Sequence, residues 1–169
     1  MDEQKKNKKV IFLDVDGVLN NSFTMDLSPN GYKGIDSVNL QCLSDIVSQT
    51  GAELILSSDW RYEWRKKYSV IDRKKCKDGM YLDRRLSEFG LKITDKTITA
   101  GMYEYRGYEI KEYLMRHPEI ESFVILDDII FDDFELYGFV EKLVYTSAMF
   151  GLTDDDVEKA ICVLNTEEK

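Results

Sequence analysis

Four short runs of apolar residues constrain the fold of this chain more than any other feature of its sequence. Each run is three or four residues long, and none alternates apolar with polar residues. The runs are Val10–Leu13, Leu54–Leu56, Phe123–Leu126 and Leu143–Tyr145. Because continuous apolar runs of this length suit strands that are buried on both faces, they predict a parallel sheet with helices on both sides.

Helical patterns lie between these runs, which makes the chain an alternation of strands and helices. One predicted helix covers residues 37–49 and ends at Gly51, and a second covers residues 107–116 and ends near Pro118. A third follows the Thr153/Asp156 capping box, where apolar residues continue at helical spacing. A further helix is expected near 81–89, and a short strand near 92–99. Such alternation predicts an α/β fold, a three-layer Rossmann-like parallel sheet with helices on both faces.

The length of 169 residues suits one compact domain, which we assign to residues 1–169. The stretch 20–36 is too short to fold into a cap domain, so we expect a flap there. Residues 70–105 can form a small lid at most. We therefore expect a minimal cap or none, and an open site.

The net charge of −9, from 23 basic and 32 acidic residues, argues against broad binding to nucleic acid or to anionic membranes. It leaves room for a local basic patch, so a nucleic-acid partner stays open without support from the charge. No apolar run approaches the roughly 18 residues of a membrane span. The N-terminal apolar run stops at Leu13, too early for a signal peptide, and three scattered cysteines suggest no disulfide framework. A cytoplasmic setting is expected.

Polar residues suited to catalysis follow three of the apolar runs. Asp14 follows the first run, Ser57 the second, and Asp127 and Asp128 the third. Ligands of open α/β sheets bind beyond the carboxyl ends of the strands. The sequence therefore predicts a functional site where these residues meet.

The segment Asp14-Val15-Asp16-Gly17 is the strongest single signal. Residues two apart on an extended segment point the same way, so both carboxylates can reach one site, and Gly17 allows a sharp turn. One carboxylate can act as a nucleophile while the second donates and accepts a proton. The alternative interpretation is a simple turn, because aspartate and glycine favour turns.

With its preceding buried strand, this segment resembles the first motif of the haloacid dehalogenase (HAD) superfamily. The resemblance implies that Asp14 is the nucleophile and a Mg²⁺ ligand. It also implies that Asp16 is the general acid and base and binds the metal through its backbone carbonyl. Dehalogenases of the superfamily lack the second aspartate, so Asp16 indicates phosphate-ester chemistry.

The remaining motifs of the superfamily find matches at the other strand ends. Ser57 matches the residue that binds the phosphate, and Asp127 and Asp128 match the acidic metal ligands. Arg106, with Lys111 in reserve, matches the cation that offsets the charge of phosphate and nucleophile. Arg61 lies one helical turn from Arg65, and we expect it to face the phosphate and help bind the substrate.

A closer resemblance is to the HAD-like domains associated with RNA-repair proteins. The segments that carry it are Val-Asp-Gly-Val-Leu-Asn, Ser-Ser-Asp-Trp-Arg, Arg-Gly-Tyr-Glu-Ile, Leu-Asp-Asp and Gly-Leu-Thr. The resulting prediction is a magnesium-dependent phosphatase that acts through an aspartyl-phosphate. Its substrate is a phosphorylated molecule, either large, such as a nucleic-acid end or a phosphoprotein, or a nucleotide or small phosphoester. Two alternatives remain open: a non-catalytic binding module on the same fold, and a phosphomutase.

Overall fold

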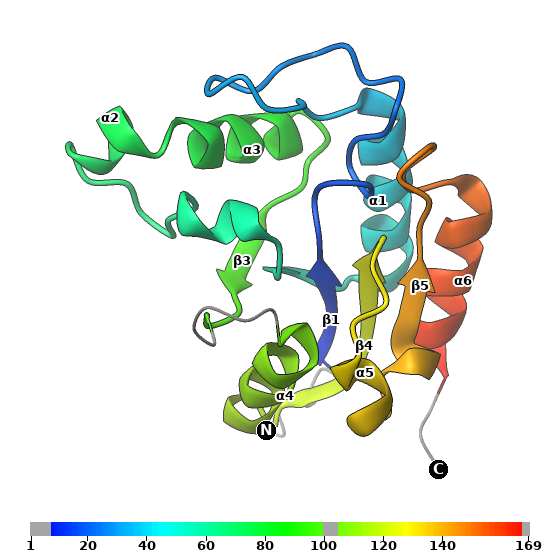
Figure 1. Cartoon of the computed structure of the whole chain (residues 1–169). Helices are drawn as coiled ribbons and strands as arrows, with labels where there is room; N and C mark the ends of the chain where they lie inside the picture. The colour runs from blue at the N-terminus through cyan, green and yellow to red at the C-terminus, as the bar shows by residue number, and fades with distance from the viewer. Residues whose placement is uncertain (1–7, 100–104, 167–169) are drawn as a thin grey trace, which may run out of the picture.

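A five-stranded parallel sheet forms the centre of the computed structural model, which describes residues 8–99 and 105–166 (Figure 1). The strands are β1 (Lys8–Leu13), β2 (Glu53–Leu56), β3 (Ile93–Lys96), β4 (Ile120–Asp127) and β5 (Leu143–Tyr145). The helices are α1 (Ser37–Thr50), α2 (Asp72–Lys75), α3 (Lys77–Ser87), α4 (Arg106–Arg116), α5 (Asp133–Leu136) and α6 (Asp154–Asn165), with short 3₁₀ turns η1 (Asp59–Tyr62) and η2 (Val140–Lys142).

The strand order is β3-β2-β1-β4-β5, so β1 lies in the middle of the sheet. The chain proceeds from β1 to β2 and β3 on one side, then crosses to β4 and β5 on the other. The order of the strands therefore reverses between β1 and β4, and ligands of such sheets bind in the crevice at that point.

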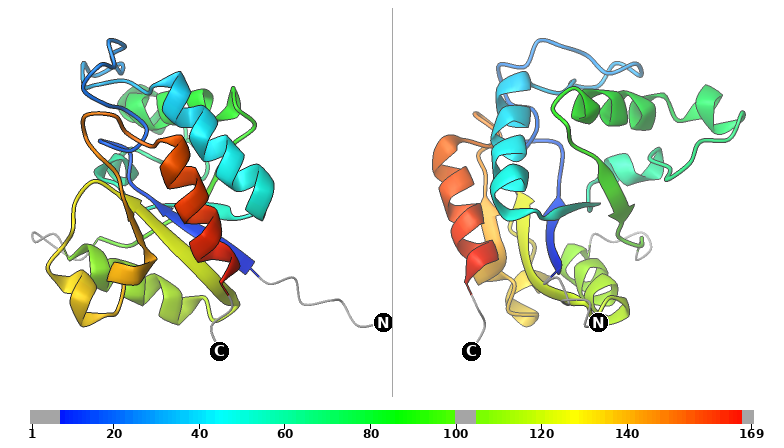
Figure 2. Two further views of the ribbon diagram at one scale, coloured as in Figure 1. Left: turned by 90° about the vertical axis from the view of Figure 1, so that its right-hand side faces the viewer. Right: turned by 180° about the vertical axis from the view of Figure 1, so that it is seen from behind.

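Successive side chains of β1 enter two different cores. Ile11 and Leu13 pack in a cluster with residues of α1, α3 and α6, whereas Val10 and Phe12 pack in a cluster with residues of α4 and α5. Figure 2 shows α1 and α6 together on one face of the sheet, with α4 and α5 on the other. The predicted three-layer α/β fold is confirmed.

The four predicted strands are all present, and three of them begin earlier than the apolar runs, β2 by the single residue Glu53. β1 starts at Lys8 and β4 at Ile120, because parallel pairing between these two strands continues past the apolar residues. Gly51 ends α1 with the left-handed backbone that glycine adopts without strain (φ 68°). The predicted capping box before α6 is also present.

The loop 20–36 is fastened to the segment that carries α3. The backbone N–H of Asn30 donates to the carboxylate of Asp78 (3.0 Å), and that of Ile35 donates to the hydroxyl of Tyr81 (3.0 Å). In Figures 1 and 2 the loop and α3 lie together beyond the end of β1.

The segment 70–105 supplies α2, α3 and the edge strand β3, apart from residues 100–104, which lie outside the described part of the chain. β3 belongs to the central sheet, and Leu82 and Leu86 of α3 belong to the larger core cluster. The flap and lid roles of the segments 20–36 and 70–105 stay predictions.

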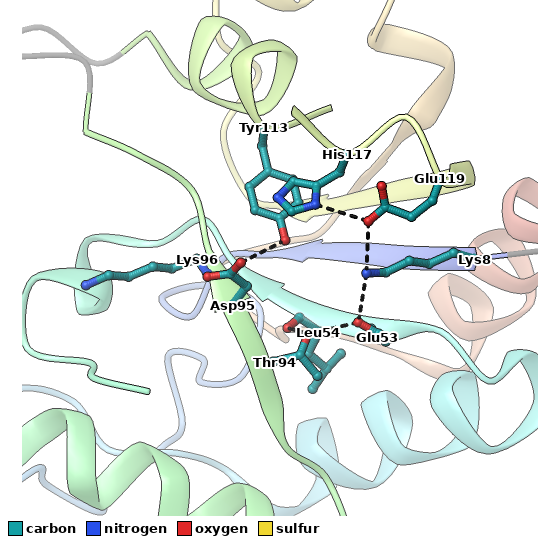
Figure 3. A network of polar contacts seen from close by, with 9 residues as sticks. All are labelled: Lys8, Glu53, Leu54, Thr94, Asp95, Lys96, Tyr113, His117 and Glu119. Atoms are coloured by element: carbon teal, nitrogen blue, oxygen red, sulfur yellow. Dashed lines mark hydrogen bonds and ion pairs between the residues drawn. The ribbon is translucent and has the colours of Figure 1, made fainter. Parts of the chain in front are cut away.

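A polar network ties the strands together at the opposite end of the sheet (Figure 3). The ammonium of Lys8 pairs with the carboxylates of Glu53 (3.4 Å) and Glu119 (3.5 Å), at the amino ends of β1, β2 and β4. Glu119 also contacts His117, whose ring stacks on Tyr113 with 4.2 Å between centroids. These contacts join the amino ends of three strands, and we assign the network a structural role.

None of the helices in the described part of the chain is long and apolar enough to cross a membrane.

Candidate active site

Asp14 follows directly on β1, at the boundary with β4. Its backbone N–H donates to the carbonyl of Leu126 on β4 (2.9 Å), which fixes the residue against the neighbouring strand end. The side chain is buried. Burial, followed by the charge of Asp127, raises the pKa of the Asp14 carboxyl well above its usual value, while the nearby Arg106 guanidinium opposes this shift.

Three carboxylates converge at this boundary. Asp14, Asp127 and Asp128 each offer an oxygen, and the three oxygens lie within 4.8 Å of one another. Asp127 is buried, and one of its oxygens accepts from the N–H of Ile129 while the other, Oδ2, has no hydrogen-bond partner. Burial raises the pKa of Asp127 to about 6. A cluster of oxygen ligands around a buried, unpartnered carboxylate oxygen fits Mg²⁺.

Gly17 makes the close approach of Asp128 possible. Its backbone is left-handed (φ 73°), and a Cβ at this position would lie 2.2 Å from Asp128 Oδ2. The carbonyl of Gly17 accepts a hydrogen bond from the hydroxyl of Thr146 after β5 (2.8 Å). The glycine of the Asp-x-Asp-Gly motif is therefore required both by its turn and by the acidic residue packed against it.

Asp16 is exposed, and its carboxylate is not part of the three-carboxylate cluster. One oxygen accepts from the amide of Asn20 (2.8 Å) and the other from the indole N–H of Trp60 (3.0 Å). It is close enough that its charge raises the pKa of Asp14 and of Asp128. The two motif aspartates are thus neighbours with different environments, one buried and one open.

The Asp16 carboxylate borders a pocket of about 530 Å³. Residues of three segments line this pocket: the loop 20–36, η1 and its flanks, and the start of α3. They include Tyr32, Lys33, Trp60 and Tyr62. A space of this size falls in the range of small-molecule sites.

Ser57 follows β2 and is completely buried. Its backbone N–H donates to the carbonyl of Leu13 on β1 (2.9 Å), whereas its hydroxyl has no hydrogen-bond partner. The next residue, Ser58, caps the η1 turn by accepting from the N–H of Trp60. A buried hydroxyl normally has a partner, so its absence indicates a group that a ligand can satisfy.

Arg106 is the first residue of α4, and its Nη1 lies 3.5 Å from Asp14 Oδ1. The guanidinium also lies over the ring of Phe131, 5.1 Å from its centroid, and Nη1 has no hydrogen-bond partner. Lys111, the alternative cation, is elsewhere: its ammonium lies over the ring of Tyr137. Of the two cations, the structure brings Arg106 to Asp14.

The start of α4 is held by Asp133, a residue of another helix, α5. The sequence suggests that Asp132 or Asp133 caps the helix that follows it. The structure shows no such cap on α5; instead Asp133 accepts hydrogen bonds from the N–H groups of Gly107 (3.0 Å) and Tyr108 (2.8 Å). Asp133 therefore satisfies the free end of the helix that carries Arg106.

Arg61, which we expected to face the phosphate, is engaged by other protein groups, and its part in substrate binding stays a prediction. Its side chain is buried and forms a two-point ion pair with Glu109 on α4, at 2.8 and 2.9 Å. It also donates to the carbonyl of Ser57 (2.9 Å) and to the hydroxyl of Thr97 (3.2 Å). The carboxylate of Glu109, in the first turn of α4, lies within reach of the guanidinium. Arg61 thus links the chain at Ser57, just after β2, to α4, the helix that begins at Arg106.

The sequence reasoning did not find the roles of two residues that shape this site, Asn20 and Glu109. Asn20 lies four residues after Asp16, and this local spacing could have indicated the contact. Glu109 pairs with Arg61, 48 residues earlier in the chain, and no local sequence pattern predicts a partner at that distance.

The fold and this arrangement of strand-end residues define a protein of the HAD class, whose members are generally hydrolases of the phosphatase type. Residues 10–157 match the family described as the HAD domain in Swiss Army Knife RNA repair proteins, and the chain belongs to this family. Both resemblances drawn from the sequence, to the superfamily and to the RNA-repair subgroup, are confirmed. A comparison with curated proteins finds no match.

Proposed function

We propose that this protein is a magnesium-dependent phosphomonoester hydrolase that acts through an aspartyl-phosphate on Asp14. The observation that carries the proposal is a set of buried polar atoms without hydrogen-bond partners, two at adjoining strand ends and one at the start of α4. These atoms are Ser57 Oγ, Arg106 Nη1 and Asp127 Oδ2. A donor hydroxyl, a donor guanidinium and an acceptor carboxylate beside one buried aspartate suit a phosphate and its counter-ion.

Asp14 and the Asp127–Asp128 pair, with the backbone carbonyl of Asp16, would hold Mg²⁺, which supplies positive charge against the phosphoryl oxygens when bound. The protein's own cation, Arg106, favours the ionised form of Asp14, the form that can attack. Ser57 and Arg106 donate hydrogen bonds to the phosphoryl oxygens and orient the phosphorus for attack.

In the first step an Asp14 oxygen bonds to phosphorus while the bond to the leaving oxygen breaks, and Asp16 gives that oxygen a proton. In the second step water attacks the phosphorus, Asp16 takes a proton from the water, and inorganic phosphate leaves. Asp14 is then free again. Positioning and electrostatics carry most of such catalysis.

The test is hydrolysis of 4-nitrophenyl phosphate with Mg²⁺ or with a chelator. Wild type should be active with Mg²⁺ only, and Asp14→Asn should lower the rate by on the order of a hundredfold or more. Asp155→Asn removes an exposed carboxylate at the start of α6 and serves as the matched control. Equal rates for wild type and Asp14→Asn across several phosphoesters would instead favour a non-catalytic binding module.

A phosphomutase is the second alternative, and the fate of the phosphoryl group separates it from a phosphatase. Transfer to another hydroxyl in place of release to water would support the mutase. The substrate candidates are a nucleic-acid end, which the RNA repair proteins of the family bring into consideration, a phosphoprotein, and a nucleotide or small phosphoester. A cytoplasmic setting is also proposed, supported by three cysteines that are all free.

A further inference from the structure

The pocket beside Asp16 is the place where a leaving group has to lie, if Asp16 is the residue that protonates it. Asp16 lines this pocket, and its carboxylate is held there from two sides, by Asn20 at 2.8 Å and by Trp60 at 3.0 Å. A proton donor must come within hydrogen-bond reach of the oxygen it protonates. The group attached to that oxygen then occupies the pocket.

Aromatic rings form much of the pocket wall. Tyr32 and Tyr62 are 67% and 55% exposed, and Trp60 lies between core and surface. Such rings offer faces on which a planar group can stack. Two of these rings pack against neighbouring side chains. The ring of Trp60 lies 6.4 Å from that of Tyr81 between centroids, and the buried Arg61 guanidinium lies 5.6 Å from the centroid of the Tyr62 ring.

Charged residues line the rest of this pocket, and the acidic Asp59, Glu63 and Asp78 outnumber the one base, Lys33. Glu63 and Asp78 line the pocket, and both are fixed by hydrogen bonds to Asn30 of the loop 20–36. Asp59, at the start of η1, is exposed, and the described residues offer it no hydrogen bond or ion pair. Carboxylates accept hydrogen bonds from N–H groups and repel further phosphates.

We propose that this pocket binds the nucleoside of a nucleoside monophosphate, with a base that carries an exocyclic amine. The base stacks among Tyr32, Trp60 and Tyr62, its amine donates to a wall carboxylate such as Asp59, and the sugar oxygen that leaves faces Asp16. A phenyl ring, as in phosphotyrosine, would use the aromatic wall but leave the carboxylates without donors. This inference rests on the proposed function.

The first test compares kcat/KM for adenosine 5′-monophosphate and ribose 5-phosphate, in which an anomeric hydroxyl replaces the base. The nucleotide should be favoured about tenfold or more, the range of base–aromatic stacking. The double variant Tyr32→Ala/Tyr62→Ala should bring this ratio close to one by lowering kcat/KM for the nucleotide. Tyr145→Ala, a tyrosine 56% exposed outside the pocket, is the matched control and should keep the ratio.

The second test needs neither metal nor catalysis. Cytidine carries an exocyclic amine and an N3 acceptor where uridine carries a carbonyl and an N3–H, so only cytidine presents a donor at the exocyclic position. We expect cytidine to quench the fluorescence of Trp60 at a lower concentration than uridine. Asp59→Ala should reduce this difference. Trp64, the other tryptophan, is buried and gives a constant background.

The outcomes separate the two proposals. Hydrolysis of both sugar phosphates at similar kcat/KM, or a preference for a phosphotyrosine peptide over the nucleotide, would overturn the nucleoside assignment while the phosphatase stands. If no phosphomonoester is hydrolysed, the proposed function fails. Preferential quenching by cytidine would then still show a nucleoside pocket, and equal quenching by both nucleosides would overturn it.

Discussion

Substitution of either partner of the ion pair between Arg61 and Glu109 should destabilise this protein strongly. The two side chains are 5% and 3% exposed and meet at 2.8 and 2.9 Å. Removing one partner of such a buried pair leaves an uncompensated charge and costs about 3–5 kcal/mol. We therefore expect Glu109→Leu to lower the free energy of unfolding by that amount, out of a total of about 5–15 kcal/mol.

Urea denaturation measures this loss directly. With a slope of about 2 kcal/mol per molar urea, the midpoint should fall by about 2 M. Glu112→Leu is the control on the same helix: its partner Arg116 is 59% exposed and 3.7 Å away, so the change should stay within about 0.5 kcal/mol.

The double variant Arg61→Met/Glu109→Leu separates stability from function. Two apolar side chains leave no buried charge, so most of the lost stability should return. Activity should not return, because the guanidinium that binds the Ser57 carbonyl is gone. A cost below 1 kcal/mol for Glu109→Leu alone would refute the reasoning, and so would full activity of the double variant.

Three further predictions concern the strand ends. Gly17→Ala should lower the free energy of unfolding by about 1–2 kcal/mol because of the left-handed backbone alone, and urea denaturation measures this. It should also abolish magnesium-dependent turnover, measured as phosphate release, because the added Cβ displaces Asp128. The pKa of Asp127, raised from 3.8 to about 6, disfavours its ionised form in the folded state. The free energy of unfolding of the metal-free protein should therefore fall by up to about 3 kcal/mol as pH rises from 4 to 7. Mg²⁺ should raise the melting temperature more at pH 7.5 than at pH 5, and equal increases at the two pH values would contradict this. Asp133→Ala should cost about 1 kcal/mol and slow turnover, whereas Asp132→Ala, which caps no helix, should do neither.

The sequence predicted the features of this fold that depend on local pattern. The apolar runs gave four of the five strands, and the residues that follow them meet where the strand order reverses, as Asp14 and the Asp127–Asp128 pair show. β3 was expected only as a short strand near 92–99, because its Ile-Thr-Asp-Lys sequence at the edge of the sheet carries a weak apolar signal.

The partners of individual polar side chains were beyond the reach of sequence reasoning. We expected Arg61 to face the phosphate because it lies one helical turn from Arg65. Such spacing shows only that two residues share a side of a helix, and not which residues pack against that side. The structure supplies Glu109 from another helix. Asp133 caps α4 rather than its own helix for the same reason: the choice between two helix ends is made by tertiary packing.

The central claim is that Asp14 carries the phosphoryl group during turnover. The direct measurement is an acid quench of wild type turning over an aryl phosphate with Mg²⁺, followed by mass spectrometry of the peptide that contains residues 10–20. We predict a phosphoryl adduct on Asp14 that is absent from Asp14→Asn and from samples quenched without Mg²⁺. Phosphate release that depends on Mg²⁺ and persists undiminished in Asp14→Asn, with no adduct on this peptide, would contradict the account.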